Sequence, residues 1–411
     1  MHKTMAEQAD KNDSIELVAE CLCKAHRFTA AVPRSALPLS ASYCHCDSCR
    51  WLTGALYSTY VPWPGSYEAI RASSLRRYKF SESITALSCG VCSGNLFAET
   101  AADSDKPSYG VVTGALTNLA EPDLLKISHH IFVGDTKDGG VTPWLCDANP
   151  DGTRPQLWST HRGQSEEYSS TDHTHWPLPS TDASPPEETP VRCHCGGVDL
   201  VLRNPIPVFA GQDRASLPGF VDPESNKLLG LFDCCDSCRM SSGVDIFHWT
   251  FVLPEHLAFP SPNKTESSKS SSLPPSSFPK SSIELKTAIS APSETRDPRW
   301  GTLTFYSSSP DVQRYFCSRC SASVFYAADG RPEVLDLAIG LLHSENGSRA
   351  EDLVSWEFGA KMTWRQDAVG GWREGLVQSV EGAADRLRKG RGLPKNWRRI
   401  QKEEKEAATK Q

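Results

Sequence analysis

The sequence has no long apolar run and no excess of positive charge, and both absences exclude classes of protein. Its longest apolar stretch, around Leu337 to Leu342, is far shorter than the ~18 residues that a membrane-spanning helix needs. The 43 Lys and Arg residues are outnumbered by 50 Asp and Glu residues, so the formal net charge is −7. A chain with this balance is not built as a whole to neutralise nucleic-acid phosphates. We therefore expect no membrane partner, and any contact with nucleic acid has to be confined to a local basic segment such as RLRKGRGLPKNWRR (386–399).

A secretory signal is also missing from the N-terminal segment MHKTMAEQADKNDS, which has neither an apolar core nor a cleavage pattern. This predicts an intracellular protein, cytoplasmic, with the nucleus as the alternative. Because cytosolic thiols are kept reduced, we do not expect the 15 cysteines to form a disulfide framework. Metal ligation or thiol chemistry is the better interpretation.

The cysteines, apart from Cys146, fall into two groups that repeat each other. The first group reads C-x-C, C-x-C-x-x-C and C-x-x-C, and the second differs only in having CC-x-x-C in the middle. The flanks repeat as well: CDSCRWLTG (46–54) matches CDSCRMSSG (235–243), and CGVCSGNLF (89–97) matches CSRCSASVF (317–325). The sequence therefore predicts two related domains in tandem.

Composition sets the expected boundaries of these domains. The 411 residues suit two or three domains, and we expect a first domain at 16–150, a Ser- and Pro-rich linker at 151–190 and a second domain at 191–370. Within the second domain, residues 260–298 lack the hydrophobic content that offsets ordering entropy, which predicts a disordered insertion. The charged tail, 371–411, suits a short solvated helix interrupted at Pro394.

The segments between the cysteine pairs favour strands. Residues 55–63, 127–134 and 243–253 are rich in aromatic and β-branched residues and are bounded by Gly or Pro. A mainly β fold, with each domain held together by metal, is the predicted fold class.

Two cysteine pairs in each repeat predict a closed metal site. Zinc prefers four ligands in a tetrahedron, and C-x-C and C-x-x-C spacings let neighbouring thiolates share one ion. The simplest assembly joins the first and last pairs of each repeat, and with all four positions filled it would be structural. The predicted ligands are Cys21, Cys23, Cys89 and Cys92 in the first domain, and Cys193, Cys195, Cys317 and Cys320 in the second.

Cys44, Cys46 and Cys49 then remain as three sulfurs in one short segment. Zinc with three protein ligands keeps a fourth position open, where it polarises a carbonyl or holds an incoming thiolate. Arg50 could bind a carboxylate of a peptide-like thiol, or be a plain surface arginine. Gly54 marks either a turn or a close backbone approach to a ligand. A purely structural triplet is the competing interpretation.

The series C-x-C, C-x-C-x-x-C-R with a following Gly, and C-x-x-C resembles the glutathione-dependent formaldehyde-activating enzyme family, which includes centromere protein V. The resemblance covers approximately residues 16–146 and again 191–367. It implies a β-tent fold in each domain, a structural zinc on the four-cysteine set and a catalytic zinc on Cys44, Cys46 and Cys49. The implied activity is that of a carbon-sulfur lyase, the reversible joining of glutathione to formaldehyde to give S-hydroxymethylglutathione.

The second repeat departs from this pattern at one ligand. Asp233 stands where the first repeat has Cys44, beside Cys235 and Cys238. Asp233 could ligate zinc through oxygen, the adjacent Cys234 could substitute, or the metal could be lost. We therefore expect the first domain to carry the activity on glutathione and an aldehyde. The alternative is a non-catalytic, zinc-stapled binding protein for a protein or chromatin partner. The natural aldehyde and the oligomeric state stay open.

Overall fold

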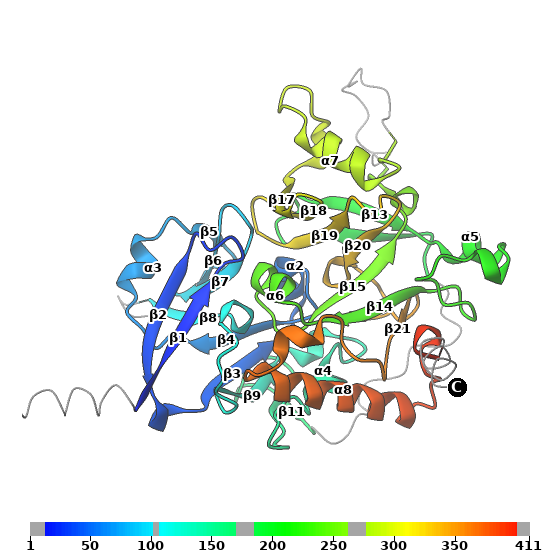
Figure 1. The fold of residues 1–411 in the computed structure, drawn as a ribbon. Coiled ribbons are helices and arrows are strands. Elements are labelled where there is room, and N and C mark those ends of the chain that lie inside the picture. Colours follow the sequence, from blue (N-terminus) through cyan, green and yellow to red (C-terminus); the bar gives the residue numbers. More distant parts are fainter. Residues whose placement is uncertain (1–12, 102–106, 170–184, 262–276, 401–411) are drawn as a thin grey trace, which may run out of the picture.

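The computed structural model describes residues 13–101, 107–169, 185–261 and 277–400, and the fold is mainly β, as the sequence predicts (Figure 1). None of the helices in these ranges is long and apolar enough to cross a membrane. Cysteine clusters that suit zinc lie between the strands, and a helix closes the described chain near its C-terminal end. The predicted fold class is confirmed.

The first half of the chain forms a hairpin and a nine-stranded sheet. Strand β1 (Ser14–Glu20) pairs antiparallel with β2 (Arg27–Pro33). The sheet has the order β11-β10-β9-β3-β4-β8-β7-β6-β5. Its strands are β3 (Leu39–Cys44), β4 (Ser58–Pro62), β5 (Arg76–Lys79), β6 (Ile84–Ser88), β7 (Asn95–Thr100), β8 (Ser108–Val111), β9 (Leu125–Ile131), β10 (Gln156–Trp158) and β11 (Glu167–Tyr168).

The second half forms a three-stranded sheet, β12-β13-β16, and a seven-stranded sheet, β17-β18-β19-β20-β15-β14-β21. Strand β3 pairs parallel with β9, and β14 pairs parallel with β21, so β9-β3-β4-β8-β7-β6-β5 corresponds strand by strand to β21-β14-β15-β20-β19-β18-β17. The bounds are β12 (Glu188–Arg192), β13 (Asp199–Arg203), β14 (Leu228–Asp233), β15 (Phe247–Val252), β16 (Leu257–Ala258), β17 (Leu303–Ser309), β18 (Val312–Cys317), β19 (Ser323–Ala328), β20 (Leu335–Ala338) and β21 (Val354–Trp356).

The repeated CDSCR segments form two short helices, α2 (Asp47–Thr53) and α6 (Asp236–Ser242). A cysteine sulfur accepts the free amide at the N-terminus of each helix, from Cys49 in α2 and from Cys238 in α6. Each helix ends at a glycine in the left-handed region, Gly54 at φ 79° and Gly243 at φ 88°. The glycines therefore mark turns, one of the two roles that the sequence left open.

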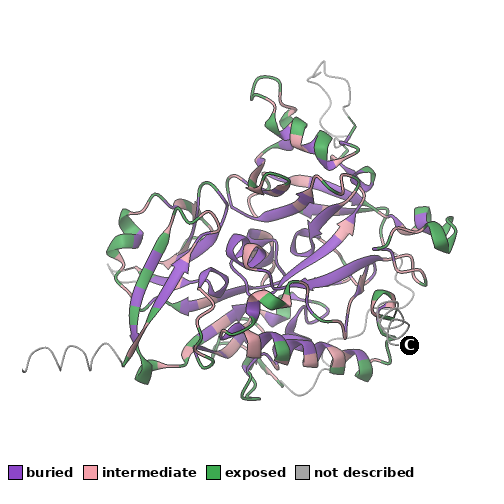
Figure 2. Ribbon diagram, in the orientation of Figure 1, coloured by how far each residue is buried: buried purple, intermediate pink, exposed green. Residues whose placement is uncertain are grey.

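Each of these helices docks on the other repeat, in the buried middle of the molecule (Figure 2). A Cβ atom at Gly54 would lie 2.2 Å from the carbonyl oxygen of Ser323, and the Gly340 amide donates to the Gly54 carbonyl. In the same way the Gly114 amide donates to the carbonyl of Gly243. One apolar core runs through both halves. The turn at the helix end and this packing explain Gly54 without the contact to a ligand that the sequence also allowed.

Helix α8 (Arg373–Gly390) is packed rather than solvated, which corrects our expectation for the tail. It contacts α4 (Thr142–Leu145), and Leu376, Val380 and Ala384 are buried on its inner side. These residues recur every four positions, the spacing of an amphipathic helix. The helix ends before Pro394, and residues 401–411 lie outside the described residues.

Two further segments differ from the expected boundaries. Strands β10 and β11 fall in the range taken as linker, where Leu157 is buried against Val133 and Cys146. Helix α7 (Ser282–Ser290) lies in the range expected to be a disordered insertion. This segment is ordered because the side chains of Leu285 and Ile289 are buried. The Ser-rich centre of that insertion, 262–276, lies outside the described residues. The remaining short helices are α3 (Glu68–Ala72) and α5 (Ile206–Ala210).

Candidate metal centres

The four-cysteine sets assemble in both halves as the sequence predicts. The sulfur atoms of Cys23 and Cys89 are 3.6 Å apart, and those of Cys195 and Cys317 are 3.4 Å apart. All four ligand atoms in each set lie within 4.8 Å of one another. A zinc tetrahedron with Zn–S bonds of ~2.3 Å places its sulfurs roughly 3.8 Å apart. The two sets therefore fit a tetrahedral zinc in spacing and in donor chemistry.

Backbone amides aim at these sulfurs. The Cys23 amide donates to Cys92 Sγ at 3.5 Å, and the Val91 amide donates to Cys89 Sγ at 3.4 Å. Hydrogen bonds from the Cys21 and Cys92 side chains, together with the backbone amides of Cys92 and Val91, lower the pKa of the Cys89 thiol. Such hydrogen bonds favour the thiolate, which is the form that binds a metal.

The first triplet lies where strand β3 ends and helix α2 begins. Cys44 is the last residue of the strand, and Cys46 and Cys49 are at the start of the helix. The three sulfurs lie within 4.8 Å of one another, Cys44 and Cys49 are buried, and Cys46 is partly exposed. Three soft sulfur donors with one accessible side suit a three-coordinate zinc site with an open position.

Strand β4 supplies two hydroxyl side chains next to this triplet. Ser58 is the cross-strand partner of Cys44, and Tyr60 is two residues further along the same face. Burial and the thiols of Cys49 and Cys44 raise the pKa of Tyr60 well above its usual value. At neutral pH this phenol therefore keeps its proton.

His45 is inside the triplet segment but turns away from it. Its Nε2 lies 3.1 Å from Nδ1 of His130, and both rings are fully buried. Burial lowers the pKa of His45 to about 3, so the ring is neutral. His45 and His130 belong to none of the candidate metal clusters among the described residues, so the pair has a packing role rather than a ligand role.

The second triplet forms from Asp233, Cys235 and Cys238, whose ligand atoms lie within 4.8 Å of one another and are all buried. Cys234 is not part of it, because its thiol contacts the carbonyl of Thr363. Asp233 Oδ1 accepts from the Cys235 amide at 2.8 Å. Arg314 Nη1 lies 3.5 Å from Cys238 Sγ, a contact that the first triplet does not have among the described residues.

The two arginines of the CDSCR segments differ sharply in their partners. Arg239 donates through Nε to Asp236 and through Nη1 to the carbonyls of Gly114 and Leu116, each at 2.7 to 2.8 Å. Arg50 is only 5% exposed and bonds Asp47 through Nη2, whereas its Nε and Nη1 atoms have no partner among the described residues. A buried guanidinium with free donors is a ready partner for a carboxylate.

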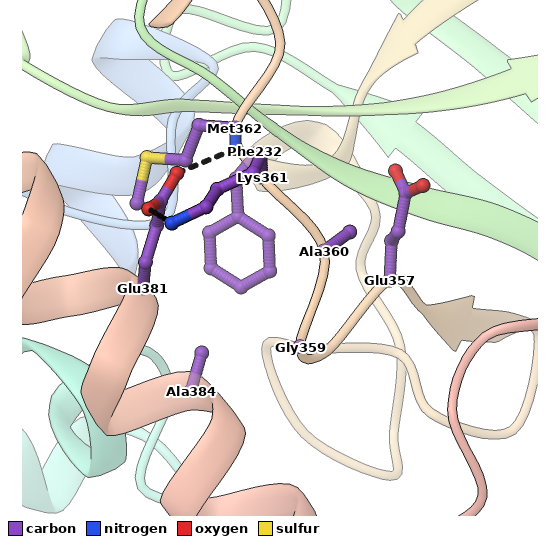
Figure 3. Close-up of a pocket in the computed structure, with 8 residues that line it drawn as sticks. All are labelled: Phe232, Glu357, Gly359, Ala360, Lys361, Met362, Glu381 and Ala384. Atoms are coloured by element: carbon purple, nitrogen blue, oxygen red, sulfur yellow. Dashed lines mark hydrogen bonds and ion pairs between the residues drawn. The ribbon is translucent and has the colours of Figure 1, made fainter. Parts of the chain in front are cut away.

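A small pocket elsewhere in the fold does not involve the cysteines. It lies between α8 and the loop after β21 (Figure 3). Glu381 in this pocket accepts from Lys361 Nζ at 2.8 Å and from the Met362 amide at 2.9 Å. Its carboxylate anchors the loop to the helix, and no candidate metal ligand lines the pocket.

Sequence reasoning missed Ser58, Tyr60 and Arg314 because they come from strands, and strand register decides which side chains face a given site. It placed all the clustered cysteines and Asp233 correctly together.

Comparison with known proteins gives a match to one family model, over residues near the N-terminal end of the chain. Residues 16–135 match the family model of the glutathione-dependent formaldehyde-activating enzyme. This range contains the first four-cysteine set, the first triplet and Arg50. Neither the curated proteins nor the solved structures contain a significant match. The resemblance seen in the sequence is thus confirmed over residues 16–135.

Proposed function

We propose that the protein is a zinc-dependent carbon-sulfur lyase that acts on glutathione–aldehyde adducts of the S-hydroxymethylglutathione type, with its active site in the first domain. The observation that carries the proposal is the partly exposed triplet of Cys44, Cys46 and Cys49 next to the free guanidinium donors of Arg50. Support also comes from the match of residues 16–135 to the family model.

Zinc fits the first triplet by its donor set and spacing, and when bound it would supply Lewis acidity and favour the thiolate form of an incoming thiol. Arg50 binds a carboxylate of the thiol substrate through Nε and Nη1 and so orients the sulfur. Tyr60 keeps its proton and donates a hydrogen bond to the aldehyde oxygen. In the addition, the thiol proton ends on that oxygen and a carbon-sulfur bond forms. The reverse reaction breaks the same bond.

The four-cysteine sets have a separate, structural role in this proposal. Each joins the hairpin at the start of a domain to a turn 66 residues or more further along the chain, as the Cys23–Cys89 and Cys195–Cys317 contacts illustrate. With four sulfurs filling the tetrahedron, no position is left for a substrate. A reducing compartment such as the cytoplasm, where the cysteines stay free, suits both kinds of site.

The alternative, a binding protein that uses its basic tail, receives no support from the described part of that tail. Arg386 pairs with Asp147, Arg388 with Asp385 and Arg391 with Glu351. Guanidinium groups already paired with carboxylates make a poor phosphate-binding surface.

The test is the rate of exchange between glutathione and S-hydroxymethylglutathione, measured by NMR with formaldehyde and the zinc-loaded chain. We expect acceleration over the protein-free rate, its loss in Cys46→Ala and its retention in the matched variant Cys235→Ala. Equal acceleration by Cys46→Ala, or loss in Cys235→Ala alone, would place the activity elsewhere.

A further inference from the structure

We propose that Arg314, Tyr326 and Asp336 close the second triplet to ligands, and that Ala86, Ala98 and Gly110 keep the first triplet open as the floor of its thiol site. The inference rests on the proposed function only for the identity of the thiol. The difference in access comes from the two sheets themselves.

The two sets of residues occupy equivalent positions. Strands β6, β7 and β8 correspond to β18, β19 and β20 in sheet order. The cross-strand partners run in the same register in both sheets, as Ala86–Ala98–Gly110 and as Arg314–Tyr326–Asp336. The strands that bear the triplets match as well, since Cys44 is opposite Ser58 and Asp233 is opposite Phe247. Each row of three therefore crosses the sheet at the same place relative to its triplet.

In the second domain this row is filled by large side chains that contact one another. Arg314 Nη1 lies 3.5 Å from Cys238 Sγ, and its guanidinium carbon is 5.1 Å from the centre of the Tyr326 ring. Arg331 stacks near the same ring at 5.4 Å and pairs with Asp336 at 2.7 Å. The three ligand residues beneath are all buried. In this arrangement the side chains of Arg314, Tyr326 and Asp336 block the access of a thiol to the second triplet.

In the first domain the equivalent residues are Ala86, Ala98 and Gly110. The alanine side chains end at the β-carbon, and the glycine has no side chain. A Cβ atom at Gly110 would lie 3.6 Å from Cδ1 of Tyr60, so the row borders the tyrosine next to the triplet. Cys46 is partly exposed, whereas its counterpart Cys235 is buried. The free donors of Arg50 lie in the same domain. Ala86 and Ala98 are each 8% exposed, and the row lacks the arginine, the phenol and the carboxylate that lie over the second triplet.

This assigns a specificity role to positions 86, 98 and 110. A side chain at position 86 as long as that of Arg314 would reach the first triplet, as Arg314 reaches Cys238. Substitution there should exclude the thiol without removing a metal ligand.

The first test is Ala86→Arg in the full chain, with the metal replaced by Co²⁺ so that glutathione binding is read from the sulfur-to-cobalt absorption. We expect at least a tenfold loss of affinity for glutathione with unchanged metal content. Thr85→Arg, one residue away on the opposite face of β6, is the matched control and should bind normally. Wild-type affinity in Ala86→Arg would overturn the inference.

The second test needs no glutathione, so it separates this inference from the proposed function. Alkylation of the full chain by iodoacetamide is followed by mass spectrometry at Cys46, Cys235 and Cys238. We expect labelling at Cys46 first, and an increase of at least tenfold at Cys238 in Arg314→Ala but not in Arg314→Lys. Unchanged labelling at Cys238 in Arg314→Ala would overturn the inference, whereas a wild-type chain that binds no glutathione would overturn only the proposed function.

Discussion

Arg50 and Arg239 share the same CDSCR motif but should respond in opposite ways when each is replaced by methionine. Arg239→Met leaves the buried carbonyls of Gly114 and Leu116 without donors. Each such group costs about 1–3 kcal/mol, so the free energy of unfolding should fall by about 2–6 kcal/mol. Arg50→Met removes only a pair with Asp47, whose side chain is 42% exposed, worth about 0.5 kcal/mol at most. It also removes two buried donors that have no described partner, so stability should stay constant or rise.

The binding of a thiol that carries a carboxylate should show the reverse order. A bidentate contact to a charged group is worth about 2–3 kcal/mol, so Arg50→Met should weaken glutathione binding about 30- to 150-fold. Urea denaturation gives the stability of both variants, and calorimetric titration gives the affinity for glutathione and for cysteamine, which has no carboxylate. Cysteamine binding should not change. If Arg50→Met destabilises the chain as much as Arg239→Met and binds glutathione normally, the reasoning is refuted.

Three further outcomes follow from the described contacts. Asp245 and Arg373 form an ion pair at 2.9 Å in which both side chains are 1% exposed. Asp245→Ala leaves the buried Arg373 charge unpaired, so the free energy of unfolding in urea should fall by about 3–5 kcal/mol, and most of it should return in Asp245→Leu/Arg373→Met. Burial lowers the pKa of His248 from 6.5 to about 3, so as the pH falls the unfolded chain protonates this histidine before the folded chain does. The free energy of unfolding should therefore fall as pH drops below 6.5, by up to about 1.4 kcal/mol per pH unit, and the slope should be shallower in His248→Phe. Cys89→Ser should lose one zinc by elemental analysis and lower the Tm, while Cys146→Ser, at a buried cysteine outside every cluster, should keep the full zinc content.

The cysteine spacings were enough to predict which residues gather. Short spacers bring neighbouring thiols together whatever the rest of the fold does, so Cys21 and Cys23 or Cys89 and Cys92 could be paired from the sequence. The repeated flanks extended the same prediction to Asp233, which the structure places with Cys235 and Cys238.

Contacts between distant segments could not be predicted in this way. The different partners of Arg50 and Arg239 depend on carbonyls that the other repeat presents, and both arginines have the same local sequence. Arg314 reaches Cys238 only because β18 lies three strands from β15 in the sheet, in a register that the sequence does not state. The apolar residues of helix α8 have helical spacing in the sequence. The many charged residues around them favoured a solvated helix, and the contacts that bury the apolar side come from distant segments.

The most direct test of the central claim is native mass spectrometry of the zinc-loaded chain with glutathione, because one spectrum counts both metal and bound thiol. The account predicts one glutathione per chain, lost in Cys46→Ala and kept in Cys235→Ala, with the zinc of both four-cysteine sets present in each variant. An adduct that persists in Cys46→Ala, or that disappears only in Cys235→Ala, would contradict the assignment of the open site to the first domain.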